Sequence, residues 1–304
     1  MERYQRLNQY LMKRLGERTL KICIDGGFTC PNRDGTKSHT GCIFCGERGS
    51  GEHIHYENAI SEQVKNYFKS YKSTRANRFI AYFQNFTNTY DTIINLKTKY
   101  DSALIDDRIV GLAISTRPDC INTEIVQLIK SYQKKYMVWV ELGLQTANEA
   151  TGKLINRCYS NVDFSNAVKL LNKNAIDVVT HIMVGLPNEN DFDLKNTIHF
   201  LNSHSIQGLK IHSTYVIQNT ELATMYYQGT YIPLTLEHYL DCLIEIITHI
   251  SPNIIIHRIS GDAPKNLLIA PLWNSHKKLV LNGLDKLLEE KNLYQGIYYK
   301  EILQ

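Results

Sequence analysis

Three cysteines lie close together in a glycine-rich segment near the start of the chain. Eleven residues separate Cys30 from Cys42, and two separate Cys42 from Cys45. Thiolates are soft ligands that select zinc, copper(I) or iron-sulfur clusters. A closed structural zinc site needs four nitrogen or sulfur ligands, and these cysteines supply only three. The spacing therefore predicts a metal site whose fourth position is filled by something else.

Two ways of filling that position follow from the residues. His39, His53 and His55 lie in the same region, and one of them could complete a Cys3His zinc site in a nucleic-acid module without catalysis. Alternatively, the three cysteines could hold a [4Fe-4S] cluster and leave one iron free to bind a small chelating molecule. The spacing by itself leaves both open.

The residues around the cysteines carry a family resemblance. Residues 27–35 read GFTCPNRDG and residues 41–45 read GCIFC. These motifs resemble the radical S-adenosylmethionine (SAM) superfamily, in which an aromatic residue, here Phe44, lies inside the last Cys-x-x-Cys. The spacing of eleven then two departs from the common superfamily pattern but is shared with a bacterial subfamily called YhcC/YtqA-type. That subfamily is similar in turn to the radical SAM part of the Elongator catalytic subunit, and the likeness spans roughly residues 5–300.

The resemblance implies a set of cofactors. A [4Fe-4S] cluster would be held by Cys30, Cys42 and Cys45, and SAM would bind its free iron. Reductive cleavage of SAM to a 5'-deoxyadenosyl radical would then require an external electron donor such as flavodoxin or ferredoxin. The protein would be an enzyme.

The resemblance also places SAM contacts at the ends of successive strands. Arg117 is expected to pair with the SAM carboxylate, and the third to fifth strand ends to meet ribose, carboxylate and adenine. The usual Gly-Gly-Glu after the second strand is absent, and Gln84 and Asn85 stand in its place. For each residue alone, an ordinary structural role is an equal alternative. The expected SAM-binding residues are Gln84, Asn85, Ser115, Arg117, Glu141, Gln145, Gly185 and Leu186.

The rest of the chain predicts elements that bring these residues to one edge of a sheet. Short β-branched runs alternate with longer amphipathic segments, a pattern typical of parallel strands joined by covering helices. Chemistry in such barrels collects at the carboxyl ends of the strands. We therefore expect an α/β fold, a partial (β/α)6 TIM-like barrel. Its strands are predicted at Leu20–Ile24, Arg78–Phe83, Val110–Ser115, Met137–Leu142, Val178–Val184 and Gly208–Ser213, with helices near 57–72, 122–135, 160–173 and 191–204.

Three regions are expected along the chain: a basic N-terminal segment over 1–20, the partial barrel over 21–230, and a C-terminal α/β extension over 231–304. The extension is predicted to contain a helix over 235–250, a strand at Asn253–His257 and an amphipathic helix at Asn274–Glu290.

The composition limits the class of protein. A chain of 304 residues with 43% apolar residues can bury a sizeable core. No apolar run reaches the roughly 20 residues of a membrane-spanning helix, so no membrane association is expected. Seven cysteines with irregular spacing argue for reduced thiols and hence a cytoplasmic location.

The substrate stays open. The net charge of +4 is mild, but six basic residues lie between Glu2 and Lys21. Together with Arg157, Lys210 and many tyrosines they suit phosphates and bases, so tRNA modification is one hypothesis. A solvated basic helix, and a small metabolite or porphyrin-like substrate, are the alternatives.

Two further cysteines have a possible functional role. Cys120 and Cys158 follow predicted strand-end loops, so either could donate a hydrogen atom or anchor a substrate. The alternative is that they are small buried residues, which is common for free cysteine.

Overall fold

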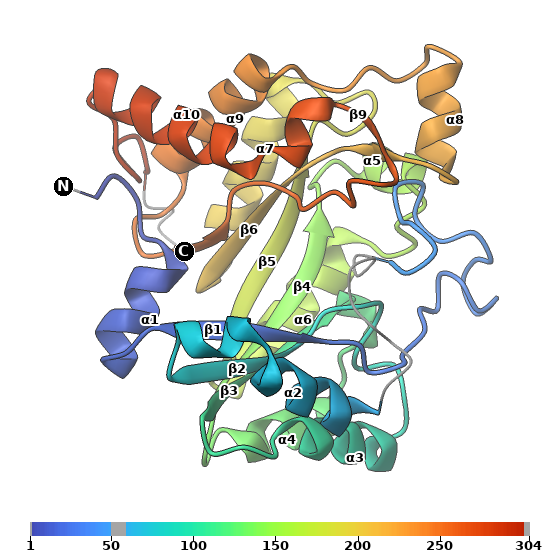
Figure 1. The fold of residues 1–304 in the computed structure, drawn as a ribbon. Helices are drawn as coiled ribbons and strands as arrows, with labels where there is room; N and C mark the ends of the chain where they lie inside the picture. The colour runs from blue at the N-terminus through green and yellow to red at the C-terminus, as the bar shows by residue number, and fades with distance from the viewer. Residues whose placement is uncertain (1, 50–58, 301–304) are drawn as a thin grey trace.

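Seven parallel strands form the main sheet of the computed structural model, which describes residues 2–49 and 59–300. The sheet curls around an interior, with most of the helices on its outside (Figure 1). The strand order is β1-β2-β3-β4-β5-β6-β8, and every neighbouring pair is parallel. The strands are β1 Thr19–Ile24, β2 Arg78–Phe83, β3 Ile109–Thr116, β4 Met137–Gln145, β5 Asp177–Val184, β6 Gly208–Ser213 and β8 Ile255–Arg258.

The partial α/β barrel predicted from the sequence is confirmed, with one strand more than expected. The seventh strand is β8, which the sequence assigns to the C-terminal extension. Gly208 of β6 pairs with Ile255 of β8, so the main sheet continues past residue 230. The reason is burial: Ile255 and Ile256 are both buried, and an apolar strand of this kind is stable only when both of its faces are covered.

Helices join the parallel strands as crossovers, as the alternating pattern predicts. Asn122 caps α4, because its side chain accepts a hydrogen bond from the backbone N–H of Ile125. The helix α3 was not anticipated, because its exposed face breaks the apolar periodicity.

None of the helices in the described residues is long and apolar enough to cross a membrane. The helices are α1 Leu7–Leu15, α2 Ile60–Lys69, α3 Ile93–Ala103, α4 Thr123–Tyr132, α5 Glu149–Leu154, α6 Asn161–Lys173, α7 Asp191–Asn202, α8 Glu221–Tyr227, α9 Leu236–His249 and α10 Lys277–Glu290.

The basic N-terminal segment has a structural role that its composition did not reveal. Leu7 and Leu11 of α1 pack inside the curl of the sheet, and the backbone N–H of Ile256 donates to the carbonyl of Gln5. The helix thereby closes the amino-terminal end of the barrel and links it to β8. The apolar residues that it covers are Ile80, Tyr82, Ala113, Trp139, Val179 and Ile255.

Because α1 closes the barrel, substitutions at two adjacent residues of this helix should change the stability of the protein by different amounts. Leu11 is 2% exposed and Met12 is 46% exposed. Leu11→Ala should lower the free energy of unfolding by about 2–5 kcal/mol, because it leaves a cavity beneath the sheet. Met12→Ala should change it by less than about 0.5 kcal/mol. Chemical denaturation measures both, and equal effects would contradict the proposed role of α1.

Candidate active site at the carboxyl ends of the strands

The cysteine loop follows β1 and is folded by its own backbone and by one arginine. The backbone N–H of Arg33 donates to the carbonyl of Cys30, and that of Cys45 donates to Cys42. The guanidinium of Arg33 donates to the carbonyls of Cys45 at 3.1 Å, Gly46 at 2.6 Å and Glu47 at 3.0 Å. Arg33 therefore links the first part of the loop to residues 45–47, and the intervening residues are folded between these two points.

The three thiols of this loop face one cavity. Cys30, Cys42 and Cys45 are all free and all line it. The hydrogen bond between the thiols of Cys42 and Cys45 raises the pKa of Cys42 well above its ordinary value and lowers the pKa of Cys45. Two of the three thiols are therefore in direct contact.

A pair of asparagines fixes the loop to the barrel. Asn32 donates to the carbonyl of Asn156 at 2.6 Å, and Asn156 donates to the carbonyl of Gly41 at 2.6 Å. Asn32 also donates to the Sγ of Cys42 at 3.6 Å. Asn32 is completely buried, and Asn156 has φ +54, a left-handed conformation that asparagine tolerates better than most residues. The position of Cys42 is thus set by the segment that follows β4.

The cavity brings together residues that are far apart in the sequence. Of the residues predicted to bind SAM, Gln84, Ser115, Arg117 and Gln145 line it with the three cysteines. They come from the carboxyl ends of β2, β3 and β4, as the barrel geometry predicts. Additional lining side chains come from the loops and from β5 and β6; they include Phe86, Thr87, Tyr159, His181, Met183, His212 and Tyr215.

The conformation of Gln145 is unusual for a residue at a strand end. Its φ is +67, and the pairing of β4 with β5 shifts register between Gly143 and Gln145. A β carbon at Gly143 would lie 2.8 Å from Nε2 of Gln145, so the absence of a side chain there lets Gln145 fold back over the strand. Bulges next to active sites re-aim side chains in this way, and backbone strain in such places is often functional.

Two buried polar atoms on the cavity wall have no hydrogen-bond partner among the described residues. They are Oγ1 of Thr87 and Nε2 of His212. An unpaired buried polar atom is costly. The three free thiols and the polar strand-end side chains that line the same cavity fit a metal cluster with a polar ligand beside it.

Comparison with known proteins accords with this site. Residues 30–201 match the family described as the Radical SAM superfamily, and residues 206–290 match the Radical_SAM C-terminal domain. The chain is 36% identical to the Uncharacterized protein YtqA of Bacillus subtilis (strain 168), over 99% of this chain and 94% of that protein. The chain belongs to the radical SAM superfamily. The predicted relationship is therefore confirmed, and the protein is a radical SAM enzyme.

Two more distant similarities concern proteins named for tRNA chemistry or for Elongator. The tRNA uridine(34) acetyltransferase of Dehalococcoides mccartyi (strain CBDB1) is 30% identical over 61% of this chain and 39% of that protein. The structure titled as archaeal Methanocaldococcus infernus Elp3 superposes with a TM-score of 0.70 at 17% identity, covering 91% of this chain and 64% of that one. The second similarity shows that the two chains share a fold.

Arg117 of the radical SAM enzyme is already engaged by protein groups. It forms a two-point ion pair with Asp119 at 2.9 and 3.0 Å and donates to the carbonyls of Arg157 at 3.1 Å and Cys158 at 3.3 Å. Its guanidinium also lies over the ring of Tyr159. Arg117 therefore has the ordinary structural role that was the alternative to binding SAM, although the residue still lines the cavity.

The other four predicted residues do not line the cavity. Asn85 is buried and donates to Asp25 at 2.8 Å, which supports the turn before the cysteine loop. The carbonyl of Gly185 accepts from Tyr231 at 2.8 Å, and Leu186 packs in an apolar cluster beneath the loop. Glu141 lies in the middle of β4 and not at its end, because the strand continues three residues further than predicted.

Glu141 is the centre of a buried charged network inside the barrel. Its side chain is fully buried and forms ion pairs with Lys21 at 3.1 Å and with Lys210. It also accepts from Trp139 at 2.9 Å and contacts Nε2 of His181 at 2.8 Å. Although burial raises the pKa of a carboxylic acid, the two lysines hold the pKa of Glu141 well below its ordinary value. A buried carboxylate with these partners is a structural hub.

The remaining predicted ligands and cysteines have simple placements. His39 is exposed, whereas His53 and His55 lie outside the described residues. Membership of the radical SAM superfamily favours the cluster over the Cys3His zinc site. Cys120 and Cys158 are part-buried and neither lines the cavity.

A second hollow also borders the cysteine loop. Cys42 and Cys45 line it as well as the main cavity. Its other walls come from the loop and from the start of α8, and they include Arg33, Thr40, Ile43, Glu47, Asn219, Thr220 and Glu221. The two cysteines thus border two hollows.

The network predicts a pH dependence of stability. Burial, with help from Lys210, lowers the pKa of His181 to about 4. In the unfolded chain the pKa of this histidine has its ordinary value near 6.5. As the pH falls, the unfolded state therefore takes up the proton before the folded state does. The contribution of His181 is fully present above about pH 6.5 and is lost as the pH falls towards 4, by up to ~3 kcal/mol.

Replacing the imidazole tests this assignment. His181→Gln keeps a donor near Glu141 but cannot titrate, so the free energy of unfolding should depend less on pH between about 6.5 and 4 than in the wild type. Denaturant titrations across this range measure the slope. His249→Gln, which removes a more exposed histidine on α9, is the control and should leave the slope nearly unchanged. An unaltered slope in His181→Gln would contradict the assignment.

Proposed function

We propose that Cys30, Cys42 and Cys45 hold a [4Fe-4S] cluster and that SAM binds beside it in the main cavity. One observation carries this proposal: the three thiols share a cavity with the polar strand ends of β2, β3 and β4. The cluster and SAM would supply reductive cleavage of SAM to a 5'-deoxyadenosyl radical, and an external electron donor such as flavodoxin or ferredoxin would supply the electron. Free thiols of this kind suit a reducing, cytoplasmic location.

In this proposal the chain's own residues bind and orient the ligand. Gln84, Ser115 and Gln145 line the cavity and would donate or accept hydrogen bonds. Arg117 would act mainly by holding in place the segment that carries Cys158. Phe86, Met183 and Tyr215 line the same cavity and would exclude water from it.

Three of the residues that were expected to bind SAM would instead support the walls of the main cavity. Asn85 holds Asp25 behind the cysteine loop. Glu141 holds the middle of the strands together. Gly185, with φ +83, turns the chain after β5 and delivers Leu186 to the apolar cluster beneath Cys42 and Cys45.

The cluster assignment makes a direct prediction. Cys42→Ala should lose most of its iron and sulfide after anaerobic reconstitution and should form no 5'-deoxyadenosine from SAM with dithionite, because the cluster would lose one of three ligands. Iron and sulfide analysis and chromatography of the products measure both. Cys23→Ala, a part-buried cysteine of β1, is the matched control. A colourless wild-type protein with one bound metal would contradict the proposal.

We further propose that the substrate is a tRNA. The support is the similarity to a protein named tRNA uridine(34) acetyltransferase. Two of the basic residues considered for this role cannot reach phosphates, because Arg157 is completely buried and Lys210 is 3% exposed. Arg157 instead donates to the carbonyls of Leu144 and Thr146, both at 2.8 Å.

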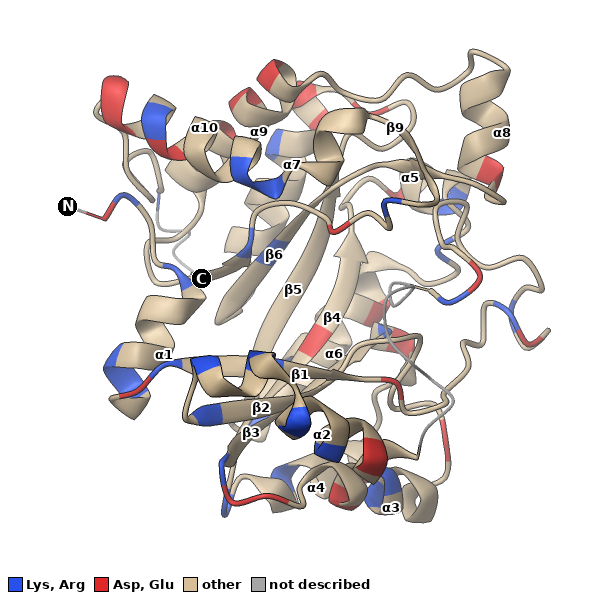
Figure 2. Ribbon diagram, viewed as in Figure 1, with Lys and Arg blue, Asp and Glu red and all other residues tan. Residues whose placement is uncertain are grey.

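The remaining basic residues are dispersed over the surface. Figure 2 shows Lys and Arg on α1 and along the strands and helices, interspersed with acidic residues. Arg6 of the N-terminal segment pairs with Asp285, and α1 covers the end of the barrel away from the cavity. Lys265 is exposed in a segment beside the cavity and is the better candidate for a phosphate contact, whereas Lys37, although exposed, pairs with Asp119 at 2.7 Å.

The nucleosides of cellular tRNA test this substrate. Deleting the gene should remove one modified nucleoside or make its precursor accumulate, and mass spectrometry of digested tRNA would detect either change. The wild-type gene should restore the profile, whereas Cys42→Ala should not. An unchanged profile, with an enzyme that still forms 5'-deoxyadenosine, would instead favour a small metabolite or porphyrin-like substrate.

A further inference from the structure

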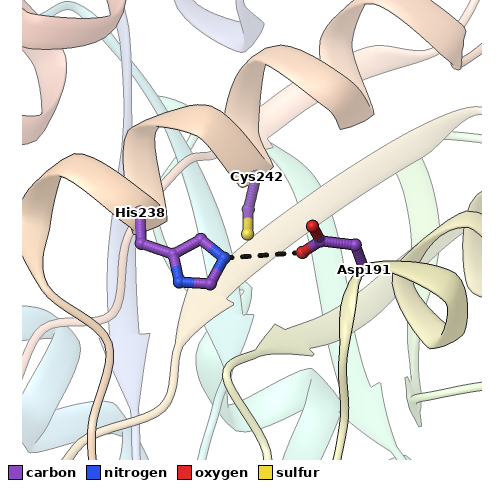
Figure 3. A group of neighbouring side chains, drawn as sticks. All are labelled: Asp191, His238 and Cys242. Atoms are coloured by element: carbon purple, nitrogen blue, oxygen red, sulfur yellow. Dashed lines mark hydrogen bonds and ion pairs between the residues drawn. The ribbon is translucent and has the colours of Figure 1, made fainter.

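Three side chains with metal-binding atoms converge on the outside of the barrel, away from the cysteine loop. Asp191 is the first residue of α7, whereas His238 and Cys242 lie on α9 (Figure 3). One ligand atom from each lies within 4.8 Å of those from the other two. Residues four apart lie on the same face of a helix, so α9 presents an imidazole and a thiol together towards the start of α7.

The spacing of two of these groups suits a metal better than a hydrogen bond. Nε2 of His238 and Oδ1 of Asp191 are 3.4 Å apart, longer than the usual distance for a nitrogen donor and a carboxylate oxygen. Tetrahedral zinc with its usual bond lengths to nitrogen and oxygen places those two atoms about 3.4 Å apart. The pair is therefore already separated by one edge of a zinc coordination tetrahedron.

The third group and its surroundings favour a cation. The residue Cys242 is only 7% exposed, and its thiol lies among acidic side chains. A bound cation would hold this thiol as the thiolate, because metal coordination deprotonates a thiol. Asp191 and His238 are more exposed, which leaves the solvent side open for a water ligand.

We infer that Asp191, His238 and Cys242 bind a zinc ion, with water as its fourth ligand. Imidazole, carboxylate and thiolate together are a ligand set that zinc accepts. The ion would join the start of α7 to the first turns of α9. These segments flank the turn at Gly185, where a β carbon would meet Leu234 at 2.8 Å. The site would stabilise the fold, and it depends on neither the cluster nor the tRNA substrate.

The inference is tested on the full-length enzyme with its cluster loaded, so that Cys30, Cys42 and Cys45 are occupied. After incubation with zinc sulfate and desalting, elemental analysis should find about one zinc per chain in addition to the iron. His238→Ala and Cys242→Ala should each weaken zinc binding by more than about 100-fold, beyond the usual loss when a residue behind a ligand is removed. Competition with a chromophoric chelator measures the affinity.

A second readout and a matched control separate ligation from damage to the fold. Cobalt(II) should give a thiolate-to-metal absorption band in a difference spectrum, and Cys242→Ala should abolish it. His249→Ala removes another histidine of α9, 3.5 Å from Glu245, and should bind zinc like the wild type. Zinc that is lost on desalting, or that is retained equally by His238→Ala and Cys242→Ala, would overturn the inference, even if 5'-deoxyadenosine formation is intact.

Discussion

A single buried carboxylate connects strands from both sides of the curled sheet. Glu141 on β4 meets Lys21 of β1 and Lys210 of β6, which lie on opposite sides of β4 in the strand order. His181 of β5 contacts the same carboxylate. A flat sheet could not bring these side chains to one point, so the network requires the curvature. That curvature is what gathers the carboxyl ends of the strands around one cavity.

The carboxylate also explains why a charged layer is stable inside a barrel. Barrel interiors are usually filled with branched apolar side chains, and burying charges costs more than their pairing returns unless they are well hydrogen-bonded. Here Glu141 is satisfied by four neighbours, one of which is the indole N–H of Trp139 from its own strand. Beneath this layer, α1 closes the barrel with apolar side chains. The cavity at the strand ends thus rests on a charged layer, which in turn rests on an apolar base.

Much of this arrangement could be predicted from the sequence. The β-branched runs identified six strands because parallel strands buried on both faces are continuously apolar, and the cysteine motif identified the superfamily. The role of α1 was missed because its basic residues dominate its composition while only Leu7 and Leu11 make the buried contacts. Glu141 was predicted at a strand end because Gly143 and Gln145 look like a turn, whereas they form a bulge within β4. Arg157 looked like a phosphate ligand because sequence does not show that its partners are carbonyls.

Cys42 and Cys45 border two hollows, and this has a consequence for how electrons would reach a cluster held there. The main cavity reaches these cysteines from the strand ends, and the second hollow reaches them from beside α8. With SAM and its target in the main cavity, a redox protein would dock at the second hollow. Electrons and substrate would then reach the cluster from different directions, and neither partner would have to leave before the other bound.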